Sequence, residues 1–310
     1  MPCQFGAGER ITPAQRRLRM RVFALSDIHV DYQANMAWLQ ALSPMHYRDD
    51  VLILAGDVSD NLDKLRAALT QVRATFAEVF FVPGNHELWV RRGESADSMA
   101  KFWHILELCA ALGVRTSPAQ VGTGPETQGV WIVPLFSWYV QPEEGEGSLF
   151  VEKAGEDLTL EIWADNYLTK WPSLAPSRTV AEAFLRLNEP HLARQYDTPV
   201  ISFSHFVPRL ELIFRTQEEH TAAGRTLQDA HPRFNFSRVA GCTGLEAQVR
   251  RLGSQIHVYG HQHRNRHRMI DGVLYISHCL GYPHERAHGY VPNVGHGPRL
   301  IWDTGTHATR

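Results

Sequence analysis

The sequence predicts an α/β layered fold, in which helices cover β-sheets. Three observations support this class. Five short segments are nearly continuous apolar runs rich in β-branched residues, which is typical of strands covered on both faces. Amphipathic helical patterns lie between several of these segments, so that strand and helix alternate along the chain. Each of the five segments also continues through a small residue into a side chain that can bind a metal ion.

The five predicted strands carry these polar residues at their carboxyl ends. In an α/β sheet, functional sites lie just beyond those ends. A glycine or serine before the polar residue permits the sharp turn by which the chain leaves the sheet. Residues far apart in the sequence are therefore expected to meet in one place. The five segments are VFALSDIH (22–29), VLILAGDV (51–58), VFFVPGNH (79–86), VISFSHFV (200–207) and IHVYGHQH (256–263).

Helices are predicted where apolar residues recur at three- and four-residue steps. Residues 60–77 form one such pattern, with Asp60 as the expected N-cap. Residues 95–112 form another, with Ser95 as the N-cap and Gly113 as the stop. Two further helix starts are predicted by capping boxes, in which a Thr precedes a Glu by three positions: Thr179 with Glu182, and Thr243 with Glu246.

The length of 310 residues suits one large domain or two small ones. We expect residues 1–19 to be a flexible leader, because they are basic but lack the apolar core of a secretory signal; an organelle transit peptide is the alternative. Residues 20–310 form the predicted single domain. Residues 138–178 interrupt its pattern with acidic residues, prolines and tryptophans. They are interpreted either as a lid over the site or as a surface insertion with its own hydrophobic cluster.

The composition narrows the choice of partners and location. A formal net charge of −2 provides no overall attraction to nucleic acid or to an anionic membrane, so nucleic acid is not excluded but is not favoured. No apolar run approaches the roughly 20 residues of a membrane span, so no membrane is expected. The four cysteines show neither paired nor metal-type spacing, which predicts a reducing compartment and hence a cytoplasmic protein. The oligomeric state is not predicted.

The strand ends together supply two carboxylates, one amide and five imidazoles. Each residue alone has a structural explanation, such as a turn, a helix cap or a buried histidine. Their joint occurrence at five strand ends predicts a site for two divalent or trivalent metal ions, with one imidazole left for proton chemistry. Mixed oxygen and nitrogen ligands suit Mn, Fe or Zn. The residues are Asp27, His29, Asp57, Asn85, His86, His205, His261 and His263.

The order of these motifs resembles the calcineurin-like metallophosphoesterase superfamily. The resemblance implies a four-layer α-β-β-α sandwich of two mixed β-sheets flanked by helices. It implies that one metal ion is held by Asp27, His29, Asp57 and His263, and the other by Asp57, Asn85, His205 and His261. The motifs are Asp27-Ile28-His29, Gly56-Asp57, Gly84-Asn85-His86-Glu87, His205 and Gly260-His261-Gln262-His263.

The resemblance implies a metal-dependent phosphoesterase that hydrolyses phosphomonoesters or phosphodiesters by a metal-bridging hydroxide. The expected catalytic residues are His86, which would stabilise a phosphoryl oxygen or protonate the leaving group, and Asp57, which would bridge the metals. Glu87 is expected either to orient the His86 imidazole or to be a solvated loop or helix-start residue. A nuclease or a serine/threonine protein phosphatase is the alternative with the same site. A non-catalytic binding scaffold is the remote alternative, because the chain retains His86.

Three arginines alternate along the chain directly after the last histidine motif. On a strand, alternate residues share one face. The arginines are therefore interpreted either as a clamp for a substrate phosphate or as a solvated strand edge. They are Arg264, Arg266 and Arg268.

Overall fold

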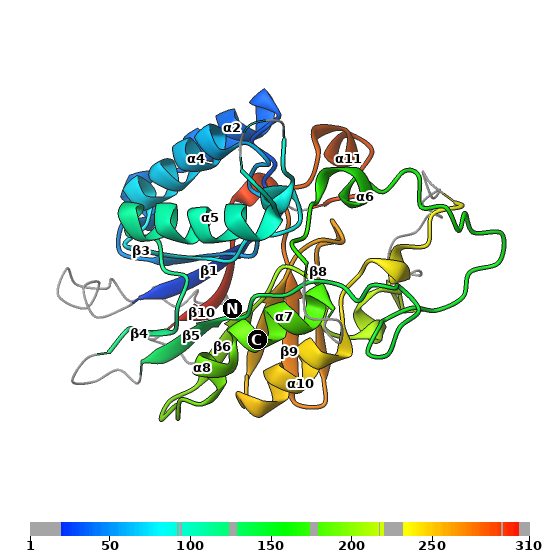
Figure 1. Cartoon of the computed structure of the whole chain (residues 1–310). Helices are drawn as coiled ribbons and strands as arrows, with labels where there is room; N and C mark the ends of the chain where they lie inside the picture. Colours follow the sequence, from blue (N-terminus) through cyan, green and yellow to red (C-terminus); the bar gives the residue numbers. More distant parts are fainter. Residues whose placement is uncertain are drawn as a thin grey trace, which may run out of the picture.

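The structure is a computed structural model that describes residues 20–91, 93, 95–123, 129–173, 179–216, 218–219, 232–292 and 294–303. Two β-sheets lie against each other, and helices cover the outer face of each (Figure 1). The predicted four-layer α-β-β-α sandwich is therefore confirmed. The predicted leader, residues 1–19, lies outside the described residues.

The first sheet has four strands in the order β10-β1-β2-β3. β1, β2 and β3 run parallel, and β10 pairs with β1 in the antiparallel direction. The helices on this side come from the first 112 residues and lie above the sheet in Figure 1. The strands are β1 (Arg21–Leu25), β2 (Val51–Leu54), β3 (Glu78–Phe81) and β10 (Arg299–Asp303), and the helices are α2 (Gln33–Gln40), α3 (Pro44–Tyr47), α4 (Leu62–Thr75) and α5 (Ser98–Leu112).

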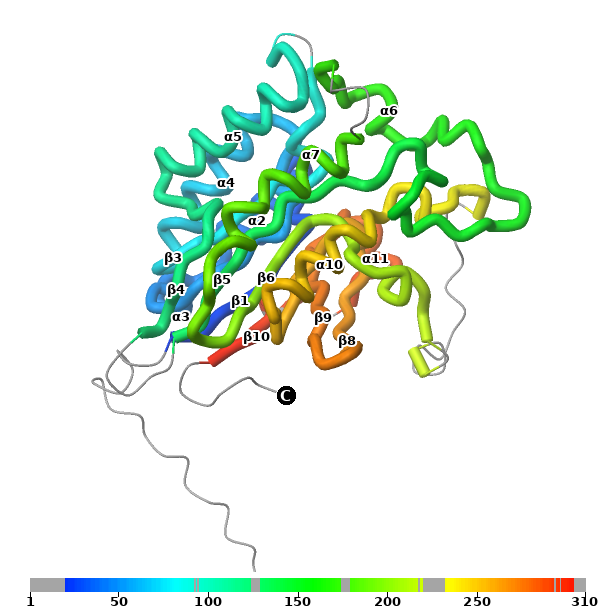
Figure 2. The backbone as a smooth tube through the Cα atoms, turned by 60° about the horizontal axis from the view of Figure 1, so that its bottom comes forward, coloured from blue at the N-terminus to red at the C-terminus, as the bar shows by residue number. Residues whose placement is uncertain are grey.

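The second sheet has six strands in the order β4-β5-β6-β7-β9-β8, of which only the outer strands β4 and β8 are antiparallel to their neighbours. Helices α7 and α10 lie across its outer face (Figure 2). The strands are β4 (Ala119–Val121), β5 (Val130–Pro134), β6 (Val200–Phe203), β7 (Ile256–Tyr259), β8 (Arg266–Ile270) and β9 (Val273–Ser277), and the helices are α7 (Val180–Leu187), α8 (Glu189–Leu192) and α10 (Thr243–Arg251).

The predicted strands are buried on both faces, because each face packs against a different layer. In β5, Ile132 belongs to the core between the two sheets, while Trp131 and Val133 belong to a second core under the outer helices. Successive side chains of a strand point to opposite faces, so one apolar run fills both cores. This explains why the strands read as continuous rather than alternating apolar runs.

Two predicted helix starts are wrong by a few residues. Helix α4 is capped by Asn61, whose side chain accepts a hydrogen bond from Lys64, and not by Asp60. The carboxylate of Asp60 instead pairs with Arg91. Helix α5 begins after Asp97, not Ser95, although Gly113 ends it in the left-handed conformation as expected.

Of the two predicted capping boxes, one is present. Thr179 and Glu182 form the reciprocal pair at the start of α7. Thr243 is already the first residue of α10, and its hydroxyl donates to the carbonyl oxygen of Gly147. Glu246 accepts the hydroxyl proton of Tyr275 instead of a backbone N–H. A contact distant in sequence has replaced the local one.

The described part of residues 138–178, here called the excursion (138–173), leaves the sheets at the end of β5 and runs along one side of the molecule, on the right in Figures 1 and 2. Its first residues are in the core: Trp138 has no exposed surface and packs against Phe206 at 5.0 Å. A partly buried ion pair between Glu156 and Arg238, with 2.8 Å between Oε2 and Nε, attaches the middle of the excursion to the domain. The excursion is therefore docked onto the domain along its length.

Short elements complete the part of the chain that the structure describes. They are α6 (Asp165–Leu168) within the excursion, α11 (Pro283–Ala287), and the 3-10 turns η1 (His86–Leu88), η2 (Leu210–Leu212), η3 (Phe236–Arg238) and η4 (Val294–His296). None of the helices among the described residues is long and apolar enough to cross a membrane.

Candidate metal centre

The carboxyl ends of β1, β2, β3, β6 and β7 meet where the two sheets join. After β1 the chain bonds to the chain after β9, with Ser26 N–H donating to the carbonyl oxygen of His278 at 2.9 Å. This junction brings together strand ends that belong to different sheets. All eight residues singled out from the sequence lie here, and seven of them are the expected ligands.

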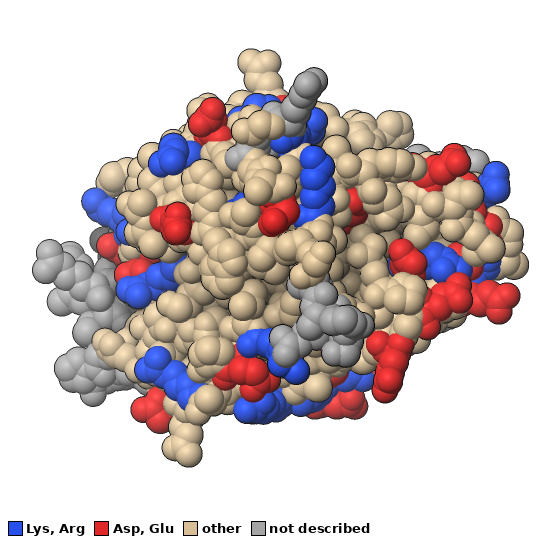
Figure 3. Space-filling view, viewed as in Figure 1, with Lys and Arg blue, Asp and Glu red and all other residues tan. Residues whose placement is uncertain are grey.

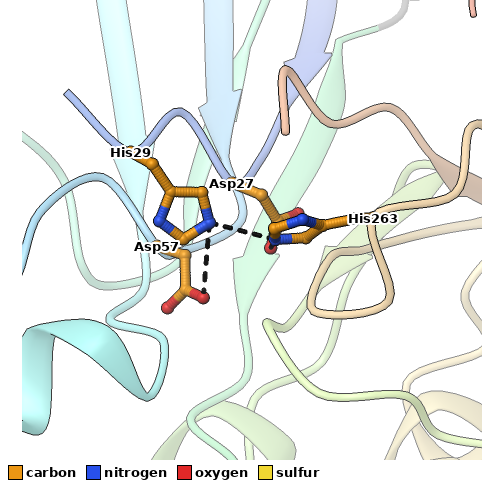
Figure 4. A group of neighbouring side chains, drawn as sticks. All are labelled: Asp27, His29, Asp57 and His263. Carbon is orange, nitrogen blue, oxygen red and sulfur yellow. Dashed lines mark hydrogen bonds and ion pairs between the residues drawn. The ribbon is translucent and has the colours of Figure 1, made fainter. Parts of the chain in front are cut away.

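The first group consists of Asp27, His29, Asp57 and His263, whose potential ligand atoms all lie within 4.8 Å of one another (Figure 4). The second group, Asp57, His205 and His261, meets the same limit. Asp57 belongs to both: its Oδ2 lies 4.0 Å from His29 Nε2 and 3.4 Å from His205 Nε2. A carboxylate in this position can bridge two cations.

Five of these residues have a left-handed backbone, with φ between +45° and +71°. Such angles are uncommon for residues other than glycine, and the strain must be offset elsewhere in the structure. Among the described residues, just two other non-glycine residues share them, Leu160 and Asp271. The strain is thus concentrated where side chains are turned into the centre: at Asp27, His29, Asp57, His261 and His263.

The glycines before Asp57 and Asn85 have a steric role. A Cβ atom on Gly84 would lie 2.2 Å from Asp57 Oδ1, and one on Gly56 would lie 2.5 Å from His205 Nδ1. Gly56 also has a φ of +81°. Because both loops pass directly against the polar side chains, any larger residue would displace them.

The imidazoles present their ring nitrogens to the interior in a fixed orientation. His205 Nδ1 lies 2.8 Å from the carbonyl oxygen of Ala55, and His261 Nε2 lies 3.0 Å from that of Val239. A carbonyl only accepts, so these nitrogens carry the protons. The remaining nitrogens, His205 Nε2 and His261 Nδ1, face each other at 3.2 Å. Two lone pairs at this distance repel unless a cation or a proton lies between them.

The first group repeats this arrangement. His263 Nδ1 donates to Glu285 at 2.7 Å, and His263 Nε2 faces His29 Nε2 at 3.0 Å. Glu285 belongs to α11, and its other partner is the N–H of Tyr282. The carboxylate therefore orients a candidate ligand from the outside, as carboxylates do around metal-bound histidines.

The electrostatics of both groups favour positive charge. Although burial opposes it, Asp27 raises the pKa of His263 to about 10, and Asp57 raises the pKa of His205 to about 9. Burial lowers the pKa of His261 to about 3. Despite burial, the nearby imidazoles hold the pKa of Asp57 well below its ordinary value. Each group thus accommodates one positive charge, and a metal ion in place of that proton fits the donor set.

Asn85 is oriented by a residue that the sequence did not single out. Its Oδ1 lies 3.1 Å from His205 Nε2, facing the second group, while its Nδ2 donates to Asp165 Oδ1 at 2.9 Å. The same oxygen accepts the indole N–H of Trp89 at 2.6 Å. Asp165 is 1% exposed and belongs to α6 of the excursion. No motif marks it, so sequence patterns had no signal to find it.

His86 lies at the open side of the centre. Its Nε2 is 3.8 Å from Asp57 Oδ2 and its side chain is 15% exposed. The ring rests on the indole of Trp89, with 3.7 Å between centroids, and the hydroxyl of Tyr282 lies 3.5 Å from Nε2. A substrate bound beside Asp57 would therefore meet this imidazole first.

The carboxylate of Glu87 bonds to backbone N–H groups rather than to the His86 imidazole, so the expected orienting role is wrong. Glu87 lies in the first turn of η1, as the helix-start alternative predicts, but it is buried and not solvated. Its carboxylate has no exposed surface and accepts four backbone N–H groups. Oε2 accepts from Asp57 and Gly84, and Oε1 accepts from Val58 and Ser59, all at 2.6–2.8 Å. Glu87 therefore fixes the loops after β2 and β3 to each other.

The three alternating arginines donate hydrogen bonds to backbone carbonyl oxygens. Arg266 is buried and donates to the carbonyl oxygens of Leu212 and Phe214. Arg268 donates to Phe214 and pairs with Glu219 at 2.6 Å. Arg264 reaches the carbonyl oxygen of Ile213 at 3.4 Å. For Arg266 and Arg268 neither a phosphate clamp nor a solvated edge fits, because these two side chains hold the turn around η2.

A family model described as calcineurin-like phosphoesterase matches residues 20–265, a range that contains His86 and all seven expected metal ligands. The chain belongs to the calcineurin-like phosphoesterase family. It is accordingly a metal-dependent phosphoric ester hydrolase, which confirms the predicted enzyme class.

A curated relative is similar over nearly the whole chain. The chain is 29% identical to the acyl-carrier-protein phosphodiesterase PptH of Mycobacterium tuberculosis, over 97% of this chain and 91% of that protein. The crystal structure of phosphopantetheinyl hydrolase (PptH) from the same organism has a TM-score of 0.65 at 24% identity, covering 91% of this chain and 99% of that chain. A third similar structure, TT1561 of Thermus thermophilus, has a TM-score of 0.44 at 12% identity, covering 84% of this chain and 89% of that chain.

Proposed function

We propose that this enzyme hydrolyses the phosphodiester that links a phosphopantetheinyl group to an acyl carrier protein. Phosphoester hydrolysis follows from the family, and the choice of substrate rests on one observation. That observation is the similarity to PptH, which extends over 97% of this chain rather than over the metal motifs alone.

The proposed centre holds two metal ions, each bound by four residues. Asp57 is shared, and Asn85 adds a neutral oxygen to the second ion. Mn, Fe and Zn are the expected elements, because the donors are imidazoles and carboxylates. When bound, such a pair lowers the pKa of a coordinated water and neutralises charge on the phosphate. One ion takes Asp27, His29, Asp57 and His263, and the other takes Asp57, Asn85, His205 and His261.

The protein itself supplies proton transfer and orientation. His86 lies close enough to Asp57 to face a phosphate held in the centre, and its partial exposure leaves Nε2 accessible. We propose that it donates a proton to the oxygen that leaves phosphorus, here the serine oxygen of the carrier protein. Trp89 and Tyr282 hold the ring in position. Part of the excursion borders the centre through Asp165, which supports the interpretation of this segment as a cover over the site.

The experiment is a substrate comparison with protein loaded with Mn, Fe or Zn. Holo acyl carrier protein is expected to lose its phosphopantetheinyl group, which mass spectrometry reads as a fall in mass to the apo form. p-Nitrophenyl phosphate and bis-p-nitrophenyl phosphate report mono- and diesterase chemistry without a carrier. Turnover of the chromogenic diester without any loss of mass from the carrier would reject the proposed substrate and keep the chemistry.

A nuclease and a protein phosphatase are tested in the same assay with single-stranded DNA and a phosphopeptide. Figure 3 shows basic and acidic side chains interspersed on one face, without a large basic field for a nucleic-acid backbone.

A cytoplasmic location is also proposed, supported by three unpaired buried cysteines: Cys109, Cys242 and Cys279.

A further inference from the structure

A cavity of about 260 Å³ lies between the excursion and the chain that leads into η3. Most of the cavity lining is apolar, and two carboxylates and one guanidinium also line it. Ile162 is 57% exposed although it lines a cavity, so a ligand there would bury apolar surface that water now covers. The apolar residues of the wall are Leu160, Ile162, Pro232 and Phe234.

Two aromatic rings lie between the cavity and the candidate metal centre. Phe234 lines the cavity and stacks on Trp163, with centroids 5.3 Å apart and ring planes 22° apart. Trp163 also meets His261 at right angles, with 5.7 Å between ring centroids. One stacked pair of rings thus connects the cavity to a proposed metal ligand.

Hydrogen bonds join the two segments that form the cavity. These segments are drawn in green and yellow on the right of Figure 1. Asp157 N–H donates to the carbonyl oxygen of Arg233 at 2.7 Å, and Lys153 Nζ donates to that of Phe234 at 2.8 Å. Leu160 has a φ of +49°, and its carbonyl oxygen accepts the N–H of Trp163 at 2.9 Å. The strained turn places Leu160 in the cavity wall and Trp163 beside the centre, which points to function.

We propose that this cavity is the subsite for the pantetheine arm, an inference that rests on the proposed function. A phosphodiester held at the metals extends one substituent toward the carrier protein and the other away from it. The arm is flexible and uncharged, and it alternates methyl and methylene groups with two amides. An apolar wall suits the hydrocarbon, and the polar groups at the cavity can bond to the amides.

The test compares Ile162→Trp, which fills the cavity mouth, with Leu158→Trp as a matched control. Leu158 is 71% exposed, lies in the same segment and does not line the cavity. Calorimetry measures binding of pantetheine to the full-length, metal-loaded protein. Kinetics give the ratio of the KM for the p-nitrophenyl diester of phosphopantetheine to the KM for bis-p-nitrophenyl phosphate. We expect Ile162→Trp to weaken pantetheine binding and to raise the KM ratio, each about tenfold, and Leu158→Trp to change neither.

The possible outcomes separate this inference from the proposed function. If the wild type does not bind pantetheine, or Ile162→Trp binds it as well as the wild type does, the subsite is overturned even though diesters are hydrolysed. If no phosphodiester is hydrolysed but pantetheine binds and Ile162→Trp weakens it, the proposed function fails and the subsite stands. Ile162→Glu, which places a charge at the same mouth, must weaken pantetheine binding in the same way.

Discussion

The side-chain amide of Asn85 has two ends with different tasks. Its oxygen faces His205 in the second group, and its nitrogen donates to Asp165. Because an amide has one acceptor end, the bond to Asp165 determines which end meets a metal ion. The same carboxylate oxygen also holds Trp89, on which His86 rests. Asp165 is therefore a positioning residue for both a proposed ligand and a proposed proton donor.

Replacing Asp165 by Ala should lower the affinity of the second metal site by about ten- to a hundredfold, as loss of an outer-shell partner does elsewhere. Metal titration followed by mass spectrometry of bound ions measures this affinity. Asp165→Asn is the matched control, because its oxygen can still accept from both Asn85 and Trp89. Equal metal binding by Asp165→Ala and wild type would refute the positioning role.

His86 and Asp57 should respond differently to substitution. His86→Ala is expected to keep both ions but to lose about 10²- to 10⁴-fold in kcat, because it removes the proposed proton donor and no proposed ligand. Asp57→Asn should lose metal as well as activity, since Asp57 belongs to both groups. Elemental analysis alongside kcat separates the two. A full metal complement in Asp57→Asn would contradict the bridging role.

At the scale of elements, the carboxylate of Glu87 fixes the relative position of two loops that follow strands. The N–H groups that Glu87 accepts come from Asp57, Val58 and Ser59 after β2 and from Gly84 after β3. Burial, followed by the charge of Asp57, raises the pKa of Glu87 to about 7, while the N–H groups of Gly84 and Ser59 act against this rise. The hydrogen bonds to Glu87 therefore hold the loop that carries Asp57 in a fixed position relative to the loop that carries Asn85.

Glu87→Gln should destabilise the fold by about 2–4 kcal/mol, because the new NH₂ group meets two N–H donors and leaves them unsatisfied. Urea unfolding measures the loss. The control is Glu78→Gln, which breaks a partly exposed pair with Arg115 and should cost less than about 1 kcal/mol. If the two variants unfold at the same urea concentration, the linking role of Glu87 is wrong.

The helix ends show the limit of local patterns. Asp60 and Asn61 are both suitable N-caps, and Asn61 takes the position while Asp60 pairs with Arg91. Likewise, Thr243 and Glu246 have capping-box spacing, but Gly147 and Tyr275 are their partners. In both cases a residue distant in sequence competes for a local hydrogen-bonding group, and spacing alone contains no information about that competitor.

At the scale of the whole molecule, two cores enclose the described cysteines. Cys109 packs in the core that includes the first sheet and its helices, Cys279 lies where the sheets join, and Cys242 is in the second core. Burial raises the pKa of Cys109 to about 12 and that of Cys242 to about 11, and it raises the pKa of Cys279 well above its ordinary value. A raised pKa keeps each thiol protonated near pH 8 and therefore unreactive.

A Cys3→Ser protein, whose remaining thiols are these three, should not react with Ellman's reagent at pH 8 while folded. After unfolding in urea it should release three equivalents, because exposed thiols have a pKa of about 8.5. Rapid reaction of any thiol in the folded protein would show that the cores open more readily than their packing indicates.

Much of this molecule could be read from short stretches of sequence. The apolar runs indicated the strands, and the glycine-led motifs located the residues that meet at their ends, because both features are local consequences of strand burial and of sharp turns. Contacts between distant segments supplied what those stretches could not. Asp165 orients Asn85 across 80 positions, and Glu87 bonds to the loop of Asp57 across 30. Such partners are brought together by the packing of the layers. Local periodicity and spacing therefore do not predict which carboxylate will bond to a given residue.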